Sequence, residues 1–192
     1  MTSTRERILD ASAELFRRQG LTGTGIKQIL ARADAPFGSL YHHFPGGKGQ
    51  LAAETIKRAG AYYAEVVTDR LLSESDLVAG VRSAFRGAGE TLEATDYADA
   101  CPIETVALEV ASTNEPLRLA TAEVFDSWLQ GLTALLVHEG IAPDPARALA
   151  HTILCALEGA FILARTTRTT EALDACSEAM ATLVESALAE AR

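Results

Sequence analysis

Apolar residues recur along this chain at intervals of three and four, the period of an amphipathic α-helix. In the first segment, residues 4–19, Ile8, Ala11 and Phe16 share one face, and Gly20 follows as a natural stop. Alanine and leucine dominate, and the breakers Gly and Pro separate the long periodic stretches. The predicted fold class is therefore all-α, with about nine helices. They are expected at residues 4–19, 25–33, 36–43, 48–72, 76–94, 102–112, 115–139, 144–168 and 171–189.

The break between the second and third predicted helices has a local cause. Pro36 disfavours a helical conformation at Ala35 and is itself suited to the first turn of a new helix. Asp34 and Ala35 are therefore predicted to form a tight turn. Thr24 is expected to cap the second helix, and residues 45–47 (PGG) end the third. Two short helices joined by a tight turn are typical of the helix-turn-helix, a DNA-binding arrangement.

The last two predicted helices, 144–168 and 171–189, are apolar over more than one face. A helix of that kind has more surface to bury than a single small chain covers. We therefore expect these helices to form a four-helix interface with a second copy of the chain, a homodimer. The small residues expected to allow close approach of the two copies are Ala156, Gly159, Ala160 and Ala164.

Charge is distributed unevenly along the 192 residues. The chain carries a formal net charge of −9, yet residues 1–50 hold seven Lys/Arg against four acidic residues, a local balance of +3. The other 142 residues therefore carry −12. A basic end on an acidic body is typical of a protein that presents one end to a polyanion. With 48% hydrophobic residues, the chain is long enough to build a core in one or two small subdomains.

Several classes of protein are disfavoured. The first residues are polar and charged, so no signal peptide is expected, and the most apolar stretch, 148–164, is short and interrupted by His151 and Glu158. We expect a cytoplasmic protein with no membrane role. The three cysteines, Cys101, Cys155 and Cys176, form no CxxC pair, which favours buried free thiols over a metal finger or a disulfide framework.

An enzyme is the main alternative from another class. A di-iron centre in a helical bundle needs Glu-x-x-His pairs, and none of the four histidines has a Glu three positions earlier. The chain also lacks a Gly-rich phosphate loop, a nucleophile elbow and an HExxH motif. We therefore expect no enzymatic activity, no cofactor and no metal. A helical scaffold that keeps the fold without binding DNA stays open, and salt-dependent binding of duplex DNA would distinguish it from a regulator.

The run GSLYHHFPGGK at residues 38–48 strongly resembles the recognition helix and following turn of the TetR family of repressors. The resemblance covers residues 4–52. Its FPGGK ending, CPI at 101–103 and LEGA at 157–160 are similar to the LmrA/YxaF branch of that family. The resemblance implies a helix-turn-helix domain over residues 1–47 and a helical effector-binding and dimerisation domain over residues 48–192. It also implies a repressor that binds a double-stranded DNA operator as a dimer and is released by a small apolar or aromatic effector.

The residue types in the helix-turn-helix have physical reasons of their own. Ser39, Tyr41 and Lys48 offer a hydroxyl, a phenol and an ammonium group to phosphate oxygens, and Gly38 leaves space for close approach to the duplex. The residues expected to read bases are Phe37, His42 and Lys27, of which Phe37 is suited to a thymine methyl group and Lys27 to a guanine edge. The residues expected to bind DNA are Thr24, Lys27, Phe37, Gly38, Ser39, Tyr41, His42, His43 and Lys48.

Some of these residues have alternative roles, and the segment differs from the TetR-family pattern at a few positions. Tyr41 as a core aromatic stays open, whereas a metal site at His42 and His43 is disfavoured because neighbours on a helix point in different directions. Asp34 occupies a position where the family usually has a turn glycine, and Asp enters the left-handed region more readily than most residues. Pro36 and Phe37 replace polar residues often found there, so we expect an unusual operator sequence.

Effector-binding pockets are mostly apolar with a few orienting polar groups. The candidate lining residues are Phe85, Cys101, Thr105, Leu108, Phe125, Trp128, Cys155 and Glu158. For any single Phe or Trp the alternative is an ordinary core position. Glu158, an acid within the most apolar helix, must be paired, exposed or oriented towards a ligand. In the family, pocket occupancy moves the helix that starts near Lys48, which joins the DNA-binding head to the body.

Overall fold

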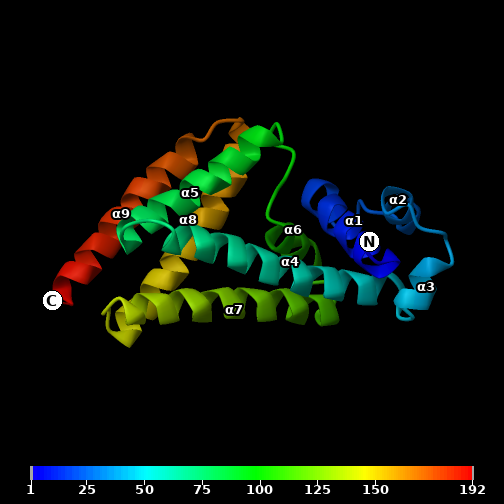
Figure 1. Ribbon diagram of the computed structural model, residues 1–192, viewed down its shortest axis with the longest axis horizontal. Helices are drawn as coiled ribbons and strands as arrows, with labels where there is room; N and C mark the ends of the chain where they lie inside the picture. Colours follow the sequence, from blue (N-terminus) through cyan, green and yellow to red (C-terminus); the bar gives the residue numbers. More distant parts are fainter. Residues whose placement is uncertain (1, 192) are drawn as a thin grey trace. The chain divides into compact units, whose positions relative to one another are not determined.

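A computed structural model describes residues 2–191, and the regular secondary structure of this part of the chain is all helical (Figure 1). The all-α prediction is confirmed. The helices are α1 (Thr4–Gln19), α2 (Ile26–Arg32), α3 (Ser39–His43), α4 (Gly47–Leu72), α5 (Leu77–Ala94), α6 (Pro102–Val110), α7 (Glu115–His138), α8 (Pro143–Thr167) and α9 (Glu171–Glu190).

Local signals in the sequence explain where the first helix begins and ends. Ser3 caps α1 through a capping box, because its hydroxyl accepts a hydrogen bond from the Glu6 backbone N–H while the Glu6 carboxylate accepts one from the Ser3 N–H. Those hydrogen bonds, the Ser3 backbone one first, lower the pKa of Glu6. Gly20 ends the helix with a φ of 74°, a conformation that favours glycine.

Two predicted helix starts are wrong by one turn or less. The third helix begins at Ser39, not Pro36, because the Pro36 carbonyl first accepts a hydrogen bond from the Ser39 N–H in a single separate turn. The second helix is capped by Gly25, not Thr24: the Gln28 side chain accepts the Gly25 N–H, while the Thr24 hydroxyl is turned inward. The end of α6 lies at Val110, two residues before the predicted end.

The chain divides into two compact units. Unit 1 contains the residues up to 62 together with residues 101–124, and unit 2 contains residues 63–100 and 125 onward. The head predicted as residues 1–47 is therefore only part of unit 1, which also includes α6, the first part of α4 and the first part of α7. Both α4 and α7 continue from one unit into the other.

Unit 1 has a small apolar core beneath the helix-turn-helix. Each of the first three helices buries apolar side chains in it, among them Ile8 of α1, Ile29 of α2 and Leu40 of α3. Phe44, directly after α3, is also fully buried. Because the inner side chains of α2 and α3 pack against α1, the outer face of the short α3 is left to solvent.

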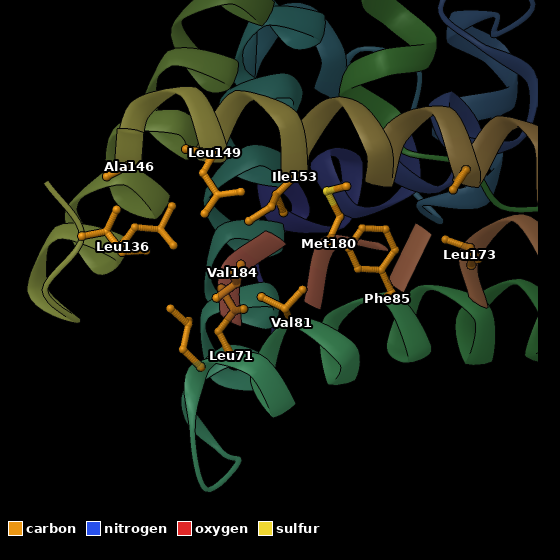
Figure 2. Close-up of a cluster of buried hydrophobic side chains, with 14 of the residues drawn as sticks. Leu71, Val81, Phe85, Leu136, Ala146, Leu149, Ile153, Leu173, Met180 and Val184 are labelled. Atoms are coloured by element: carbon orange, nitrogen blue, oxygen red, sulfur yellow. The ribbon is translucent and has the colours of Figure 1, made fainter. Parts of the chain in front are cut away.

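Unit 2 is built around α5, α8 and α9, which lie side by side (Figure 1). Its core gathers Val81 and Phe85 from α5, Ile153 from α8, and Met180 and Val184 from α9, as Figure 2 shows. Long amphipathic helices that bury one face in this way derive most of their stability from packing.

The α8 helix, Pro143–Thr167, is long and apolar enough to cross a membrane on length and composition alone, a test that core helices of soluble proteins also pass. Only 28% of its most apolar window is buried within the chain. Much of its apolar surface therefore stays uncovered in the single chain.

Candidate DNA-binding interface

The turn between α2 and α3 is a helix-ending motif with a left-handed residue. The N–H groups of Asp34 and Ala35 donate to the carbonyls of Ala31 and Leu30, the hydrogen-bond pattern of a Schellman motif. Asp34 has a φ of 47°, so the sequence-based expectation that this Asp adopts the left-handed region is confirmed. This conformation costs a non-glycine residue roughly 1 kcal/mol, so the surrounding structure must hold it.

The outer face of the recognition segment is aromatic and open. Phe37 and Tyr41, four residues apart, are 59% and 54% exposed. A methyl group added at Gly38, between them, meets nothing within 4 Å. Exposed large aromatics on a short helix leave apolar surface in water that a partner would cover. The predicted alternative that Tyr41 is a core aromatic is wrong, because its ring stays largely in solvent.

The remaining predicted residues of the recognition segment differ in exposure. His42 is exposed, whereas His43 and Ser39 are partly buried. The two imidazole rings meet edge to face at 4.8 Å. Lys27, near the start of α2, is exposed. His42 and Lys27 can therefore reach a partner without rearrangement of the fold.

Thr24 does not have the surface position that a phosphate contact requires. Its side chain is fully buried, and the hydroxyl donates to the Gly20 carbonyl at 2.6 Å. The Gln19 amide also donates to it, at 3.3 Å. Thr24 therefore closes the turn after α1 and has no open route to DNA in this conformation.

Lys48 has an internal partner in the structure. Its ammonium donates to the Leu21 carbonyl at 2.7 Å, and its side chain is partly buried. In the same turn, the N–H groups of Leu21 and Thr22 donate to the carboxylate of Glu109 in α6, at 3.0 and 2.7 Å. Lys48 and Glu109 thus both bind the backbone of the turn after α1. Because an ammonium group has three N–H donors, the bond to the Leu21 carbonyl leaves donors for the phosphate contact expected of Lys48.

Two positioning residues were missed by the sequence analysis. Glu109 is one; the other is Arg7, whose guanidinium reaches the turn between α2 and α3 and donates to the carbonyls of Ala33 and Asp34. The helical spacing of apolar residues in α1 places Arg7 on the opposite, polar face, where a charged side chain usually contacts only water. No signal in a single sequence identifies carbonyl partners so far along the chain.

Several basic side chains of unit 1 form ion pairs at its surface. The pairs are Arg5 with Glu54, Arg32 with Glu14, Arg58 with Asp10, and Lys57 with Glu123. The hydrogen bond that Arg32 donates to the Glu14 carboxylate raises the pKa of Arg32. Because exposed pairs of this kind contribute little stability, a phosphate can compete for their cations.

Comparison with known proteins agrees with this geometry. Residues 8–55 match the family described as bacterial regulatory proteins, tetR family, and residues 78–179 match the C-terminal domain of the LmrA/YxaF-like transcriptional regulators. The HTH-type transcriptional regulator LmrA of Bacillus subtilis is 32% identical over 86% of this chain and 88% of its own length. The chain belongs to the TetR family. This TetR-family protein is therefore a DNA-binding transcriptional regulator and not an enzyme, and its LmrA/YxaF-like character is confirmed.

Two further relatives extend the comparison. The HTH-type transcriptional regulator Rv0196 of Mycobacterium tuberculosis is 34% identical over 91% of the chain and 90% of its own length. The crystal structure of a regulatory protein TetR from Rhodobacter sphaeroides superposes with a TM-score of 0.83, covering 95% of this chain and 99% of that one at 21% identity. The latter likeness shows that the TetR fold extends over the whole regulator.

The residues proposed to line an effector pocket differ in their surroundings within each unit. Leu108 is 75% exposed and Cys155 is exposed, so neither faces the interior of its unit. Phe85, only 1% exposed, is part of the close-packed core of unit 2 (Figure 2), which favours the ordinary core alternative for this residue. The expectation that all three cysteines are buried is also wrong, because Cys101 and Cys176 are only partly buried.

The other lining candidates make local contacts. Phe125 and Trp128 meet edge to face at 5.7 Å in unit 2. Cys101 caps α6, and its backbone carbonyl accepts the hydroxyl of Thr105 at 2.8 Å. Glu158 is partly buried on α8. Contacts in the structure thus bring together Phe125 with Trp128, and Cys101 with Thr105.

Proposed function

We propose that this TetR-family regulator is a cytoplasmic repressor that binds an operator as a homodimer and is released by a small apolar or aromatic effector. The observation that carries the proposal is the pair of exposed aromatics Phe37, in the turn before α3, and Tyr41, on α3, whose inner side packs in the core with α1. Major-groove recognition uses such a face, with side chains on one helix meeting base edges.

The roles within the interface follow from exposure. Phe37 packs against thymine methyl groups, Lys27 reaches a guanine edge, and Gly38 permits close approach. Ser39, Tyr41, His42 and His43 contact the phosphate backbone or the flanking base edges. Lys48 holds the Leu21 carbonyl with one N–H donor and contacts a phosphate with another.

The DNA contacts are tested with duplexes that the protein selects from a random-sequence library, compared with scrambled duplexes. Phe37→Ala and Lys27→Ala should lower affinity for the selected duplex by about tenfold while leaving scrambled duplexes nearly unaffected. Lys57→Ala, which removes a cation paired with Glu123, serves as the control. Equal losses on both kinds of duplex would show that Phe37 and Lys27 do not read bases.

Homodimerisation is supported by uncharged stripes on α8 and α9. On α8 the exposed or partly exposed positions Cys155, Gly159, Ile162 and Leu163 follow helical spacing, and a methyl group at Gly159 meets nothing within 4 Å. On α9 the exposed positions 175, 179, 182, 183 and 186 are Ala, Ala, Thr, Leu and Ser. We propose these stripes as the subunit interface. Dimeric helix-turn-helix proteins typically read two half-sites about 34 to 36 Å apart, and we expect the same of this dimer.

Of the small residues expected at this interface, some lie in the core of unit 2 and one lies at its surface. Ala160 and Ala164 are 2% and 0% exposed and belong to the core of unit 2, so they do not face a second copy. Ala156 packs partly against the same core. Only Gly159 of the four keeps open space around it, because the helix turns its close-packed alanines towards α9 and α5.

The dimer is tested by placing a charge in the proposed interface. Leu163→Asp should convert the protein to a monomer at micromolar concentration and abolish operator binding, because an unpaired carboxylate would be buried between the subunits. Leu72→Asp is the matched control, since Leu72 and Leu163 are 61% and 57% exposed and lie on different helices. Light scattering measures the mass. An unmodified protein that is already monomeric would contradict the proposal.

Effector binding is supported by the LmrA/YxaF-like C-terminal domain and by Thr55. This residue of α4 is 2% exposed, and its hydroxyl has no hydrogen-bond partner within the described residues. Buried hydroxyl groups normally have partners, and a bound molecule would provide one here. Thr55→Val, which keeps the shape, should leave the fold intact while weakening the response of operator binding to a library of aromatic compounds. If no compound shifts operator affinity in the unmodified protein, the effector proposal is wrong.

A further inference from the structure

Arg7 of α1 connects three segments of the DNA-binding head. Its Nε donates to the Ala33 carbonyl at 2.9 Å, and its Nη2 donates to the Asp34 carbonyl at 3.0 Å. Its Nη1 lies 3.5 Å from the carbonyl of Thr2. A guanidinium is a rigid planar fork of N–H donors, so it fixes two acceptors at a set distance and direction from each other.

The two carbonyls that Arg7 holds belong to the turn that orients the recognition helix. Ala33 caps α2, and Asp34 is the left-handed residue that redirects the chain. The backbone bonds of this turn use the carbonyls of Leu30 and Ala31. The Arg7 guanidinium binds two other carbonyls of the same turn, those of Ala33 and Asp34. A cation at the carboxyl end of α2 is also favoured by the helix dipole.

The recognition helix depends on such support from outside. With five residues, α3 is too short to be stable or to hold its direction by its own hydrogen bonds. Leu40 and Phe44 anchor its inner side. Leu40 and Phe44 leave α3 free to rotate about its buried side, and the turn that precedes it limits this rotation. Phe37 follows Asp34 by only three residues, so the conformation of Asp34 also affects where Phe37 lies.

We propose that Arg7 is a positioning residue for sequence-specific DNA recognition: by bridging the Ala33 and Asp34 carbonyls it fixes the direction in which the following turn and α3 present Phe37 and Tyr41. The inference rests on the proposed base contacts of α3. Arg7 itself touches no base. Its loss therefore lowers discrimination between sequences and leaves the general attraction to phosphates unchanged.

The experiment compares Arg7→Gln and Arg7→Lys on the selected and scrambled duplexes over a range of salt concentrations. We expect Arg7→Gln to lose about tenfold in affinity for the selected duplex, with scrambled binding and its salt slope unchanged. Arg7→Lys keeps the positive charge but lacks the planar set of N–H donors. It should therefore also lose affinity for the selected duplex relative to scrambled ones, but by less than Arg7→Gln does. Arg58→Gln is the control, because Arg58 pairs with Asp10 on the same head without contacting the turn.

A second variant separates positioning from simple loss of stability. Asp34→Gly relieves the left-handed strain, so adding it to Arg7→Gln should restore the melting temperature of the head without restoring discrimination. Full recovery of discrimination in the double variant would overturn the proposal. So would a uniform loss on both duplexes with a salt slope lower by about one, the result expected of a phosphate contact. The affinity of the unmodified protein for the selected and scrambled duplexes is measured first, before any variant. Equal affinities for the two would overturn the base contacts proposed for the recognition segment.

Discussion

Each of the two units of this regulator is stabilised internally by a different main kind of interaction. In unit 1, side chains from one element repeatedly bind the backbone of another, as Arg7, Lys48 and Glu109 do. In unit 2, α5, α8 and α9 share a large apolar core, and the exposed ion pair of Arg82 with Glu178 links α5 to α9 at its surface. Unit 2 also has side-chain bonds to the backbone of another segment, since Arg165 of α8 donates to the carbonyls of Tyr97 and Ala98. Its helices themselves are joined mainly by the apolar core.

The length of the helices explains this difference. Helices α2 and α3 have seven and five residues and bury few side chains, so their directions are set by hydrogen bonds to their ends. Helices α5, α8 and α9 have 18, 25 and 20 residues and are fixed by packing along their length. Polar links should therefore control geometry and specificity in unit 1, and apolar burial should control stability in unit 2.

The largest expected effect comes from the core of unit 2. Phe85→Ala should destabilise the protein by about 3–5 kcal/mol, because it removes a fully buried ring and leaves a cavity among Met180, Leu173 and their neighbours (Figure 2). Urea unfolding measures the loss, and hydrogen exchange locates it in unit 2. A loss below about 1 kcal/mol would show that the site collapses around the cavity and that packing there is not decisive.

The next effect tests the turn after α1. Gly20→Ala should destabilise unit 1 by about 2 kcal/mol, because Gly20 has a φ of 74° and an added methyl carbon would lie 1.8 Å from the Glu109 carboxylate. Gly49→Ala is the matched control, since a methyl group at Gly49 in α4 meets nothing within 4 Å. Gly49→Ala should leave the stability of unit 1 unchanged or raise it. Hydrogen exchange in α1 and α2 distinguishes the two variants.

A smaller effect is expected from the Glu109 carboxylate itself. Glu109→Gln removes one of two charge-assisted acceptors and turns an amide N–H towards a backbone N–H, so unit 1 should lose about 1.5 kcal/mol. The exchange of the Leu21 and Thr22 amides should accelerate most. Glu123→Gln, which alters an exposed ion pair with Lys57, should leave those amides unchanged. Equal acceleration in both variants would contradict the specific grip assigned to Glu109.

The smallest effect concerns the ion pair across unit 2. Hydrogen bonds from Arg82 lower the pKa of Glu178, so the pair stabilises the folded state above the ordinary carboxyl pKa, about 4.3, and this contribution is lost as the pH falls through the lowered value. Because both side chains are exposed, salt should screen the effect. Glu178→Gln should change the melting temperature little at neutral pH. A large, salt-independent drop would show that polar links also hold unit 2.

The sequence by itself determined the elements of this protein. All of the predicted helices form, mostly within one or two residues of their expected ends, because helical period, caps and breakers act over a few neighbouring residues. The left-handed Asp34 and the exposed recognition face around Phe37 follow from equally local signals. The TetR resemblance was visible for the same reason, since its motif is one continuous run.

Only the tertiary structure decided the partners of side chains. It buried Thr24, attached Lys48 to the Leu21 carbonyl and turned Leu108 and Cys155 outward. The contacts of Arg7 and Glu109 join positions 26 and 88 residues apart, a separation that no local pattern encodes. Which atom a long polar side chain reaches depends on how the helices pack, and that packing is a property of the whole chain.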